Sequence, residues 1–506
     1  MMQANNMPSP AVHIRMYKQG LGDCFLLSFP RSNGQPDFQM MIDCGVITGS
    51  DPSMLVNAVQ DIYNTTNGHL DLVVGTHEHW DHLSGFNQAR SIFDKFKIDR
   101  VWLAWTEDPT NPVSQSLVKI RAARLAALRT ALSRMNLAQD SDLKRSILQV
   151  LSFFGVDPDE SSPAGGAGIA ANGDAGTSSL AAAGTAGTTR GAMQYLRARS
   201  DASVHYCNPT LDPPHTLDGV NGVQVYVFGP PVDMKLLKQS DPTKTGHETY
   251  GLTTVAAEDS FFAAFGAADG ASSYSQLQPL SYPFDPFYQI SPEEARNSGG
   301  DQFFKEHYGF DEGKDPNAWR RIDNDWLEVT SELALNLDSD TNNTSLVLAF
   351  ELGEPGSGKV LLFAADAQVG NWLSWGSLKW QVNGSGGTVQ TITSQDLLSR
   401  AIFYKVGHHG SHNATLSSQG LELMVSDDLV AMIPVVHTMA EKKGWIGMPF
   451  PDLLTRLQLK TRGRVMRIDT GLPQRQDASA LTDAEWQAFA SCVTETPLYI
   501  EYRITV

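Results

Sequence analysis

Three histidines and an aspartate fall within one six-residue segment of the chain, residues 77–82, whose sequence is HEHWDH. Neutral imidazole and carboxylate groups are suitable ligands for Zn, Mn or Fe. Four such groups are more than one tetrahedral metal takes from a single segment, so the spacing predicts two neighbouring metal ions that share this loop. The candidate ligands are His77, His79, Asp81 and His82.

Strand-like sequences precede this segment and two further candidate ligands. Apolar runs at 70–75, 360–365 and 401–407 are each followed within two residues by a residue type that binds metals. Side chains at strand ends lie on loops at one edge of a rigid sheet, where they can converge. An aspartate there is costly to bury unless it is paired or metal-bound, which makes Asp366 a candidate ligand beside His408. The alternative, an accidental solvated patch of histidines, does not explain why the motif follows a buried-looking strand.

The composition is that of a large globular protein of 506 residues, 41% of them hydrophobic. The formal net charge of −18 argues against a broadly basic nucleic-acid surface, although a local groove can still be positive. The four cysteines form no C-x-x-C pair, so neither a zinc knuckle nor a disulfide framework is predicted. The first residues are polar, and no apolar run is long enough for a membrane span. We therefore expect a soluble cytoplasmic protein.

Strands and helices alternate in residues 1–105 in the manner of a layered α/β fold. Strands are expected at 12–17, 25–29, 38–43, 70–75 and 101–105. A helix that Ser50 or Asp51 can cap is expected to follow the third strand. Its apolar face is expected to carry Leu55, Val59 and Ile62.

Two long stretches interrupt this pattern and divide the chain. The predicted parts are 1–105, the first half of the fold; 106–221, a helical and Ala/Gly-rich insertion; 222–231, a core strand; 232–341, an irregular aromatic-rich insertion; and 342–506, the second half. The first insertion is expected to hold helices at 114–135 and 142–154 and a flexible tract at 161–191. The second insertion is either a lid or pocket wall, or a plain structural elaboration.

The order of the candidate ligands resembles that of the metallo-β-lactamase superfamily of hydrolases. More narrowly, the chain is similar to the hydrolase domain of ComEC-type DNA-uptake proteins. The residues that carry the resemblance are GLGDC at 20–24, NTSLVL at 343–348 and KVGHHGS at 405–411. The resemblance covers 12–105, 220–231 and 342–470, and it implies an αββα sandwich with large insertions and a dinuclear site at one edge.

The resemblance also implies a role for each ligand. His77 and His79 would bind the first metal, and Asp81, His82 and His408 would bind the second. In the same pattern, Asp366 would bridge the two ions. Asp43 would lie behind the site and orient ligands by hydrogen bonding.

Two positions depart from the commoner patterns. Many superfamily members place a third histidine ligand of the first metal where this chain has Asn343, as the ComEC-type pattern also does. A carbonyl oxygen of Asn343 or a water there would leave the first metal more weakly held and more oxygen-rich, so Mn rivals Zn for the two divalent ions. Met448 stands where the ComEC-type pattern more often has a histidine, which leaves the substrate less defined than the fold.

Two metal ions would lower the pKa of a shared water and stabilise the charge that develops on the attacked oxygen. Asp81 could in addition take up or relay a proton. His409, Ser411 and His412 lie just beyond the last ligand and could contact a phosphate or protonate a leaving group. The alternative for these three residues is hydrogen bonding within the loop.

Three classes of function fit these residues. The first is a phosphodiesterase or nuclease, and the acidic charge favours short single strands or nucleotides over long duplexes. The second is an esterase, thioesterase or lactonase whose aromatic-rich insertion walls an apolar pocket. The aromatic residues are Phe261, Phe262, Phe265, Tyr274, Tyr282, Phe284, Phe287 and Tyr288. The third is a metal-bearing scaffold for an unspecified protein partner.

Overall fold

The computed structural model describes residues 11–32, 34–134, 141–155, 187–239, 303, 307, 337–384, 388–445 and 447–505. Two compact units divide the chain. The first contains Met1–Ala122, Leu151–Thr254 and Asp338–Val506, and the second contains Ala123–Val150 and Val255–Leu337. Most of the predicted Ala/Gly-rich tract and of the aromatic-rich insertion, including its eight aromatic residues, lies outside the described residues.

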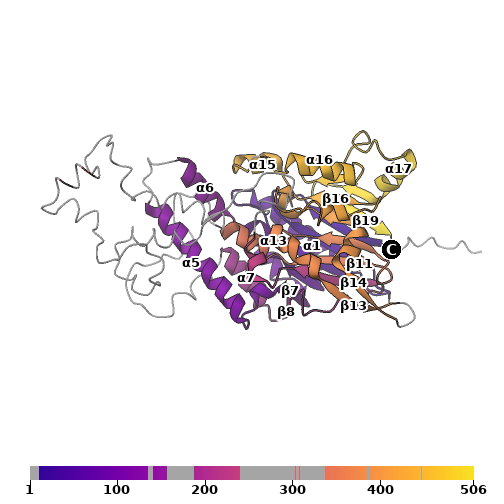
Figure 1. Ribbon diagram of the computed structural model, residues 1–506, viewed down its shortest axis with the longest axis horizontal. Helices are drawn as coiled ribbons and strands as arrows, with labels where there is room; N and C mark the ends of the chain where they lie inside the picture. The colour runs from indigo at the N-terminus through magenta and orange to yellow at the C-terminus, as the bar shows by residue number, and fades with distance from the viewer. Residues whose placement is uncertain are drawn as a thin grey trace, which may run out of the picture. The chain divides into compact units, whose positions relative to one another are not determined.

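The first unit contains two large β-sheets (Figure 1). The strand order of the first sheet is β18–β19–β1–β2–β3–β5–β7–β8. Its strands are β1 (Ala11–Tyr17), β2 (Cys24–Phe29), β3 (Phe38–Cys44), β5 (Leu72–Gly75), β7 (Arg100–Ala104), β8 (Ser203–Cys207), β18 (Val493–Glu495) and β19 (Tyr499–Thr505). Strand β1 pairs antiparallel with both β2 and β19, whereas β3, β5, β7 and β8 run parallel.

The strand order of the second sheet is β17–β16–β15–β12–β11–β10–β9. Its strands are β9 (His215–Thr216), β10 (Val223–Gly229), β11 (Val347–Leu352), β12 (Lys359–Phe363), β15 (Ala401–Lys405), β16 (Val430–Ile433) and β17 (Val465–Arg467). In this sheet, β12, β15, β16 and β17 run parallel to one another. Two small ribbons join β4 (His69–Leu70) to β6 (Lys97–Ile98) and β13 (Lys379–Asn383) to β14 (Val389–Thr393).

One apolar core is shared by the facing surfaces of the two sheets. Every second residue of β1, namely Val12, Ile14 and Met16, is buried in it, as the period of two of a strand requires. Phe25 of β2 and Phe363 of β12 meet across the sheets with their ring centroids 5.7 Å apart. Each such side chain contributes about 1.5–3 kcal/mol through burial, so the shared core holds the sheets together.

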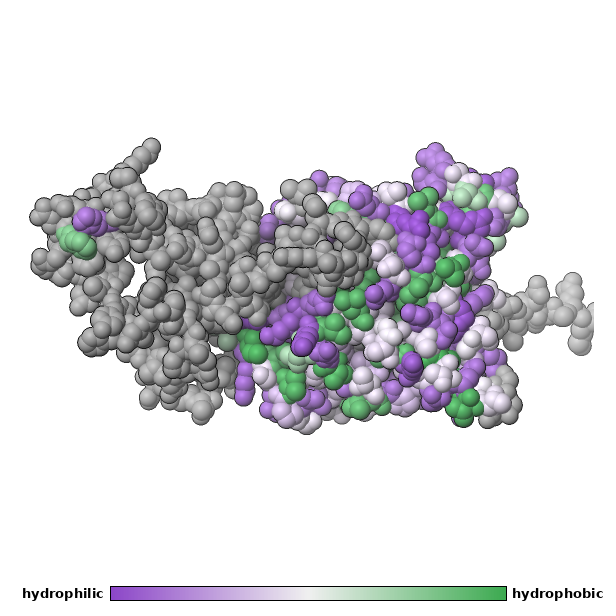
Figure 2. Space-filling model, viewed as in Figure 1, coloured by the Kyte–Doolittle hydropathy of each residue, from purple (hydrophilic) through white to green (hydrophobic). Residues whose placement is uncertain are grey.

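Helices pack against the outer face of each sheet. A second core joins α1, α4 and α7 to the first sheet, and a third joins α13, α14 and α16 to the second sheet. The helices are α1 (Pro52–Thr65), α2 (Trp80–Leu83), α3 (Gly85–Gln88), α4 (Arg90–Phe93), α5 (Pro112–Arg134), α6 (Ser141–Ser152), α7 (Thr189–Arg197), α8 (Met234–Leu237), α13 (Val369–Ser374), α14 (Ser394–Ser399), α15 (His437–Lys442), α16 (Pro451–Lys460) and α17 (Asp483–Cys492). The 3-10 turns are η1 (Trp105–Glu107), η7 (Trp375–Ser377), η9 (Gly407–Gly410) and η10 (Leu421–Leu423). In Figure 2, hydrophilic residues predominate around α16 and α17.

The mixed α/β class predicted from the sequence is confirmed. Helix α1 forms as expected: the Asp51 side chain accepts a hydrogen bond from the Ser53 amide, and Leu55, Val59 and Ile62 are buried. The expected boundary of the first insertion needs correction. Strand β8, within the predicted insertion 106–221, pairs with β7 and therefore belongs to the first sheet. A short strand after a long interruption gives little periodic signal, which explains the error.

The pairing of β19 with β1 predicts a pH-dependent contribution to stability. Burial alone would raise the pKa of Glu501, but hydrogen bonds from His13 and Arg15 lower it from 4.5 to about 2. A depressed folded-state pKa stabilises the protein above the unfolded-state value, and the contribution is lost as the pH falls through the folded-state value. Glu501→Gln should therefore lower the free energy of unfolding at neutral pH by about 1–2 kcal/mol.

Urea denaturation at a series of pH values tests this expectation. The difference between Glu501→Gln and the unaltered protein should shrink between pH 4.5 and about 2. A difference that stays constant over this window would contradict the assignment of the effect to the Glu501 carboxylate.

Candidate metal centre

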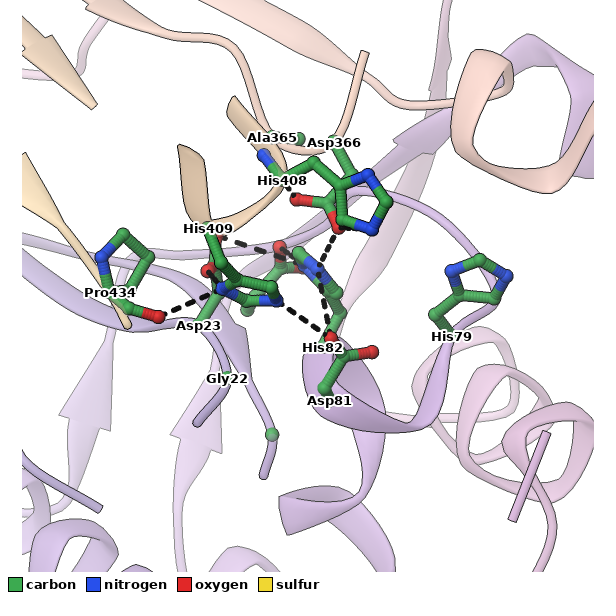
Figure 3. Close-up of polar contacts among 12 residues, drawn as sticks. Gly22, Asp23, His79, Asp81, His82, Ala365, Asp366, His408, His409 and Pro434 are labelled. Carbon is green, nitrogen blue, oxygen red and sulfur yellow. Dashed lines mark hydrogen bonds and ion pairs between the residues drawn. The ribbon is translucent and has the colours of Figure 1, made fainter. Parts of the chain in front are cut away.

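The predicted ligands come together because the strands that carry them end at one edge. The HEHWDH loop follows β5 in the first sheet, and Asp366 follows β12 in the second. Strand β15 runs parallel to β12, so its carboxyl end delivers His408 and His409, in η9, beside Asp366. Figure 3 shows Asp81, His82, Asp366, His408 and His409 converging with Asp23, which lies just before β2, while His79 lies to one side. The convergence joins four segments that are far apart in the sequence.

Four buried side chains form what we call the central group. Its members are Asp23, His82, Asp366 and His409, and one ligand atom of each lies within 4.8 Å of the others. His82 Nε2 is 3.0 Å from Asp366 Oδ2. Asp81 adjoins the group, because His409 Nε2 lies 2.9 Å from Asp81 Oδ2. A buried group of this kind could hold a metal ion.

Hydrogen bonds fix which nitrogen each ring of the central group presents. His82 Nδ1 lies 2.7 Å from Asp43 Oδ2, and His409 Nδ1 lies 2.8 Å from the Pro434 carbonyl oxygen. Both partners only accept, so each Nδ1 carries a proton and each neutral ring presents a lone pair at Nε2. That lone pair faces a carboxylate oxygen at 2.9–3.0 Å, an arrangement that requires a cation, either a second proton or a metal.

The pKa shifts describe the same charge requirement. Burial alone would lower the pKa of His82, but the surrounding carboxylates, led by Asp366, raise it well above its ordinary value. The pKa of His409 is also raised against the effect of burial, by its contact with Asp81. Without a metal, protons neutralise these carboxylates. A divalent cation would replace these protons, since a histidine must be deprotonated to bind a metal.

A second cluster lies around His79. His77 Nε2 and His79 Nδ1 are 3.1 Å apart, and His79 Nε2 is 3.8 Å from Asp338 Oδ1. Burial lowers the pKa of His79 to about 3, which leaves the imidazole neutral. Burial likewise lowers the pKa of His77 well below its ordinary range. Neutral imidazoles and a carboxylate are the kinds of group that metal ions bind.

Unsatisfied buried atoms gather around both clusters. Buried polar atoms are normally hydrogen-bonded, so such atoms call for an explanation. Those without a hydrogen-bond partner here are Asp23 Oδ1, His79 Nε2, Asp81 Oδ1, His82 Nε2, Asp338 Oδ1, Asn342 Oδ1, Asp366 Oδ2 and His408 Nδ1. Metal ions are a sufficient explanation, because nitrogen and carboxylate oxygen are the donors that Zn and Mn accept.

The two histidines after β15 occupy different places from those predicted. The family resemblance implied that His408 binds the second metal, and His409 was predicted to have a catalytic role. In the structure, His409 joins the central group, whereas His408 Nε2 lies 3.9 Å from Asp366 Oδ2 on the side toward His79. Both residues have a positive φ, as do Asp43 and Ala365. Backbone strain of this kind at four positions of one site indicates that their geometry is imposed by the surrounding fold.

Asn343 does not lie among the ligand atoms. Its Oδ1 accepts hydrogen bonds from the backbone amides of Gln368 and Asn371, and its Nδ2 donates to the Gln239 carbonyl. The expectation that Asn343 offers an oxygen to the first metal therefore conflicts with the hydrogen bonds it makes. Asp338 supplies an oxygen in that neighbourhood instead.

The residues beyond the last ligand make loop contacts. The Ser411 hydroxyl donates to Asn413 Oδ1 at 3.0 Å, which is the loop hydrogen bonding considered as the alternative for this residue. His412 is exposed, and its ring lies 6.1 Å from that of Phe450.

Two acidic residues and a lysine of the site were not predicted from the sequence. Lys405 Nζ lies 2.5 Å from Asp23 Oδ2 and donates to the Ala365 carbonyl, so it fixes the start of β2 against the end of β12. Asp23 lies within the GLGDC motif, but no local pattern in the sequence singles it out as a candidate ligand. Asp338 lies four residues before Asn342, the spacing of neighbours on one helix face, and accepts a hydrogen bond from it at 3.3 Å.

A buried ion-pair network also holds the HEHWDH loop, through the side chain of Glu78. We call it the Glu78 network, and its members are Glu78, Glu107, Arg121 and Arg190. Arg121 contacts both carboxylates, and Arg190 lies 3.1 Å from Glu78 and 2.8 Å from Glu107. Burial would raise the pKa of Glu107, but the arginines hold it below its ordinary value. The network therefore fixes the residue that lies between His77 and His79.

No protein-family model, curated protein or solved structure matches this chain. Within the part of the chain that the structure describes, no helix combines the length and the apolarity that crossing a membrane requires.

Asp43 should be needed for tight metal binding. Its Oδ1 accepts from the Thr76 amide, and its Oδ2 accepts from the Thr76 hydroxyl and from His82 Nδ1. Asn at this position tolerates the φ of 55° but leaves these three donors with one acceptor oxygen. Asp43→Asn should weaken metal binding by about 10–100-fold. Metal titration of the metal-free variant measures this, and unchanged affinity would show that the contact does not orient His82.

Proposed function

We propose that this chain is a metal-dependent hydrolase of the metallo-β-lactamase type, with an αββα arrangement and a dinuclear centre at the edge of its two sheets. The observation that carries the proposal is the set of unsatisfied, buried ligand atoms around Asp366. Asp81, His82, Asp366 and His409 would hold the second metal, with Asp23 beside them. His77, His79 and Asp338, together with Asp366, would hold the first metal.

Two divalent cations bound there would supply an acidified water and stabilise charge on the attacked oxygen. Proton uptake and the positioning of the ligands would fall to the chain's own residues. Asp81, whose Oδ1 has no hydrogen-bond partner, would serve as the acceptor for a proton from such a water. The Pro434 carbonyl sets the orientation of the His409 ring, whose Nε2 lies 2.9 Å from Asp81 Oδ2. Lys405 holds Asp23 and lies 3.5 Å from Asp366, which limits the movement of both carboxylates.

A phosphodiester is the substrate class that we favour. A two-metal clamp suits an in-line displacement at phosphorus, because it can bind the attacking and leaving oxygens together. The motifs at 343–348 and 405–411 resemble those of ComEC-type hydrolase domains, which supports a nucleic-acid or nucleotide substrate. The net charge of −18 makes a short single strand or a nucleotide the better candidate.

An aromatic stack beside the centre favours a second candidate, a small carboxylic ester, thioester or lactone. The Phe153 ring stacks on His79 at 5.2 Å and on Trp445 at 4.7 Å. Such an apolar wall next to a metal ligand suits an acyl chain.

Turnover by the purified chain separates the two candidates. The protein is incubated with Zn or Mn and with labelled single-stranded DNA, RNA and bis-(p-nitrophenyl) phosphate, and in parallel with lactones and thioesters. We expect metal-dependent cleavage of the phosphodiesters. Cleavage of the acyl substrates alone would favour the second candidate, and no turnover by fully metal-loaded protein would overturn the hydrolase proposal.

The assignment of the first metal has its own test. Asp338→Asn should lower the affinity for one of the two metal equivalents of the candidate centre and leave the other unchanged. Equal loss of both, or of neither, would remove Asp338 from the proposed ligand set.

A further inference from the structure

A second group of metal-ligating side chains lies outside the candidate centre, where the two sheets end. Strand β8 is the last strand of the first sheet, and β9 is the last strand of the second. We call this group the edge cluster, and its members are His205, Cys207, Asp212 and His215. Figure 1 shows β8 beside β7 at this end of the first sheet.

The geometry of β8 and of the β8–β9 connection brings these four residues together. His205 and Cys207 are two positions apart on β8, so their side chains project from the same face. Asp212 follows in the β8–β9 connection, where the Asn208 amide donates to its Oδ2 at 3.0 Å. His215 begins β9.

The ligand atoms already converge without a metal. His205 Nε2 lies 2.9 Å, and His215 Nε2 3.3 Å, from the same oxygen, Asp212 Oδ2. One ligand atom each of His205, Cys207 and Asp212 lies within 4.8 Å of the others. Ligands of a tetrahedral zinc ion lie about 3.4–3.8 Å apart, given Zn–N and Zn–S bonds of about 2.1 and 2.3 Å. Small side-chain movements therefore suffice to close the site.

The charges of the edge cluster also suit a divalent cation. One thiolate and one carboxylate carry two negative charges, and two neutral imidazoles carry none. A Zn²⁺ complex of this set is neutral overall, which matters because Cys207 is fully buried. Burial raises the pKa of the Cys207 thiol well above its ordinary value, so metal binding would release a proton from it. This mixed sulfur and nitrogen set favours Zn²⁺ over Mn²⁺.

We propose that the edge cluster is a structural metal site that binds one Zn²⁺ ion and thereby links β8 of the first sheet to β9 of the second. The site has a supporting aromatic wall. The Trp102 ring lies 4.7 Å from that of His215 and 6.1 Å from that of His205. All the ligands come from the chain, as in a structural zinc site.

Cobalt substitution tests this proposal in the full-length protein kept under reducing conditions. Co²⁺ bound to a thiolate gives a near-ultraviolet charge-transfer absorption, which a centre of histidines and carboxylates does not give. We expect this absorption to saturate at one Co²⁺ per chain. It should disappear in Cys207→Ser, with the loss of one bound metal equivalent, and it should persist in Asp366→Asn, which alters only the candidate centre.

Two further variants make the result decisive. His205→Ala removes a side chain that is 42% exposed, so it tests the site without disturbing a core position, and it should lose the same metal equivalent. Cys492→Ser removes a half-buried thiol outside the cluster and should leave the absorption unchanged. Absence of the absorption in unaltered protein at saturating Co²⁺, or its persistence in both Cys207→Ser and His205→Ala, would overturn the proposal.

Discussion

Asp366→Asn should remove metal binding at the candidate centre and lower the proposed hydrolytic activity by on the order of a thousandfold or more. Asp366 is fully buried, and its Oδ2 lies 3.0 Å from His82 Nε2 and 3.9 Å from His408 Nε2. Burial would raise the pKa of this carboxyl, but the surrounding histidines and Lys405 hold it well below its usual range. Asparagine keeps the shape and loses the charge, so metals that need this carboxylate would leave.

A matched control separates this effect from a general loss of buried charge. Asp71 is also a buried carboxylate, paired with Arg31 at 2.5 Å, but it lies outside the centre. Asp71→Asn should lower stability while retaining the metal content of the candidate centre per folded chain and the activity. Metal analysis after exhaustive dialysis and steady-state rates measure both. Full metal content in Asp366→Asn would contradict a bridging role for this residue.

Arg121→Met should destabilise the protein by about 3–5 kcal/mol, because it leaves buried carboxylates short of a partner. Arg121 is 6% exposed and pairs with both Glu78 and Glu107. Arg190 remains but cannot balance two buried charges. Since Glu78 lies between His77 and His79, metal binding should weaken as well. Denaturant unfolding and metal titration measure the two effects.

Charge balance is what the double variant tests. Glu107→Gln combined with Arg121→Met removes one charge of each sign, and it should recover part of the stability lost in Arg121→Met. As a control, Lys97→Met removes an exposed partner of Asp99 and should leave stability unchanged. If the double variant is no more stable than Arg121→Met, packing rather than charge accounts for the effect.

The sequence predicted the parts of the centre whose signals are local. The HEHWDH loop carries its ligands within one turn after a buried strand, and Asp366 ends an apolar run. Periodicity likewise predicted β1 and α1, because their buried faces follow the periods of two and 3.6. The α/β class follows from the same patterns.

Other parts depend on contacts that no local pattern encodes. The choice between His408 and His409 rests on the positive φ values in η9 and on the Pro434 carbonyl, which belongs to the next strand's end. Asp338 looks like an ordinary acidic residue until its helical segment is placed beside His79. Short elements such as β8 and the β13–β14 hairpin bury few residues and give weak periodicity.

The pairing of β19 with β1 has a consequence for biosynthesis. The partner of Met16 in the register is Ile500, so one edge of β1 stays unpaired until β19 has left the ribosome. A nascent chain would already display the HEHWDH loop, but Asp366 and His409 are translated hundreds of residues later. We therefore expect metal loading to wait until Asp366 and His409 have been translated, and a ribosome-stalled chain that ends before β12 to hold no tightly bound ion at this centre.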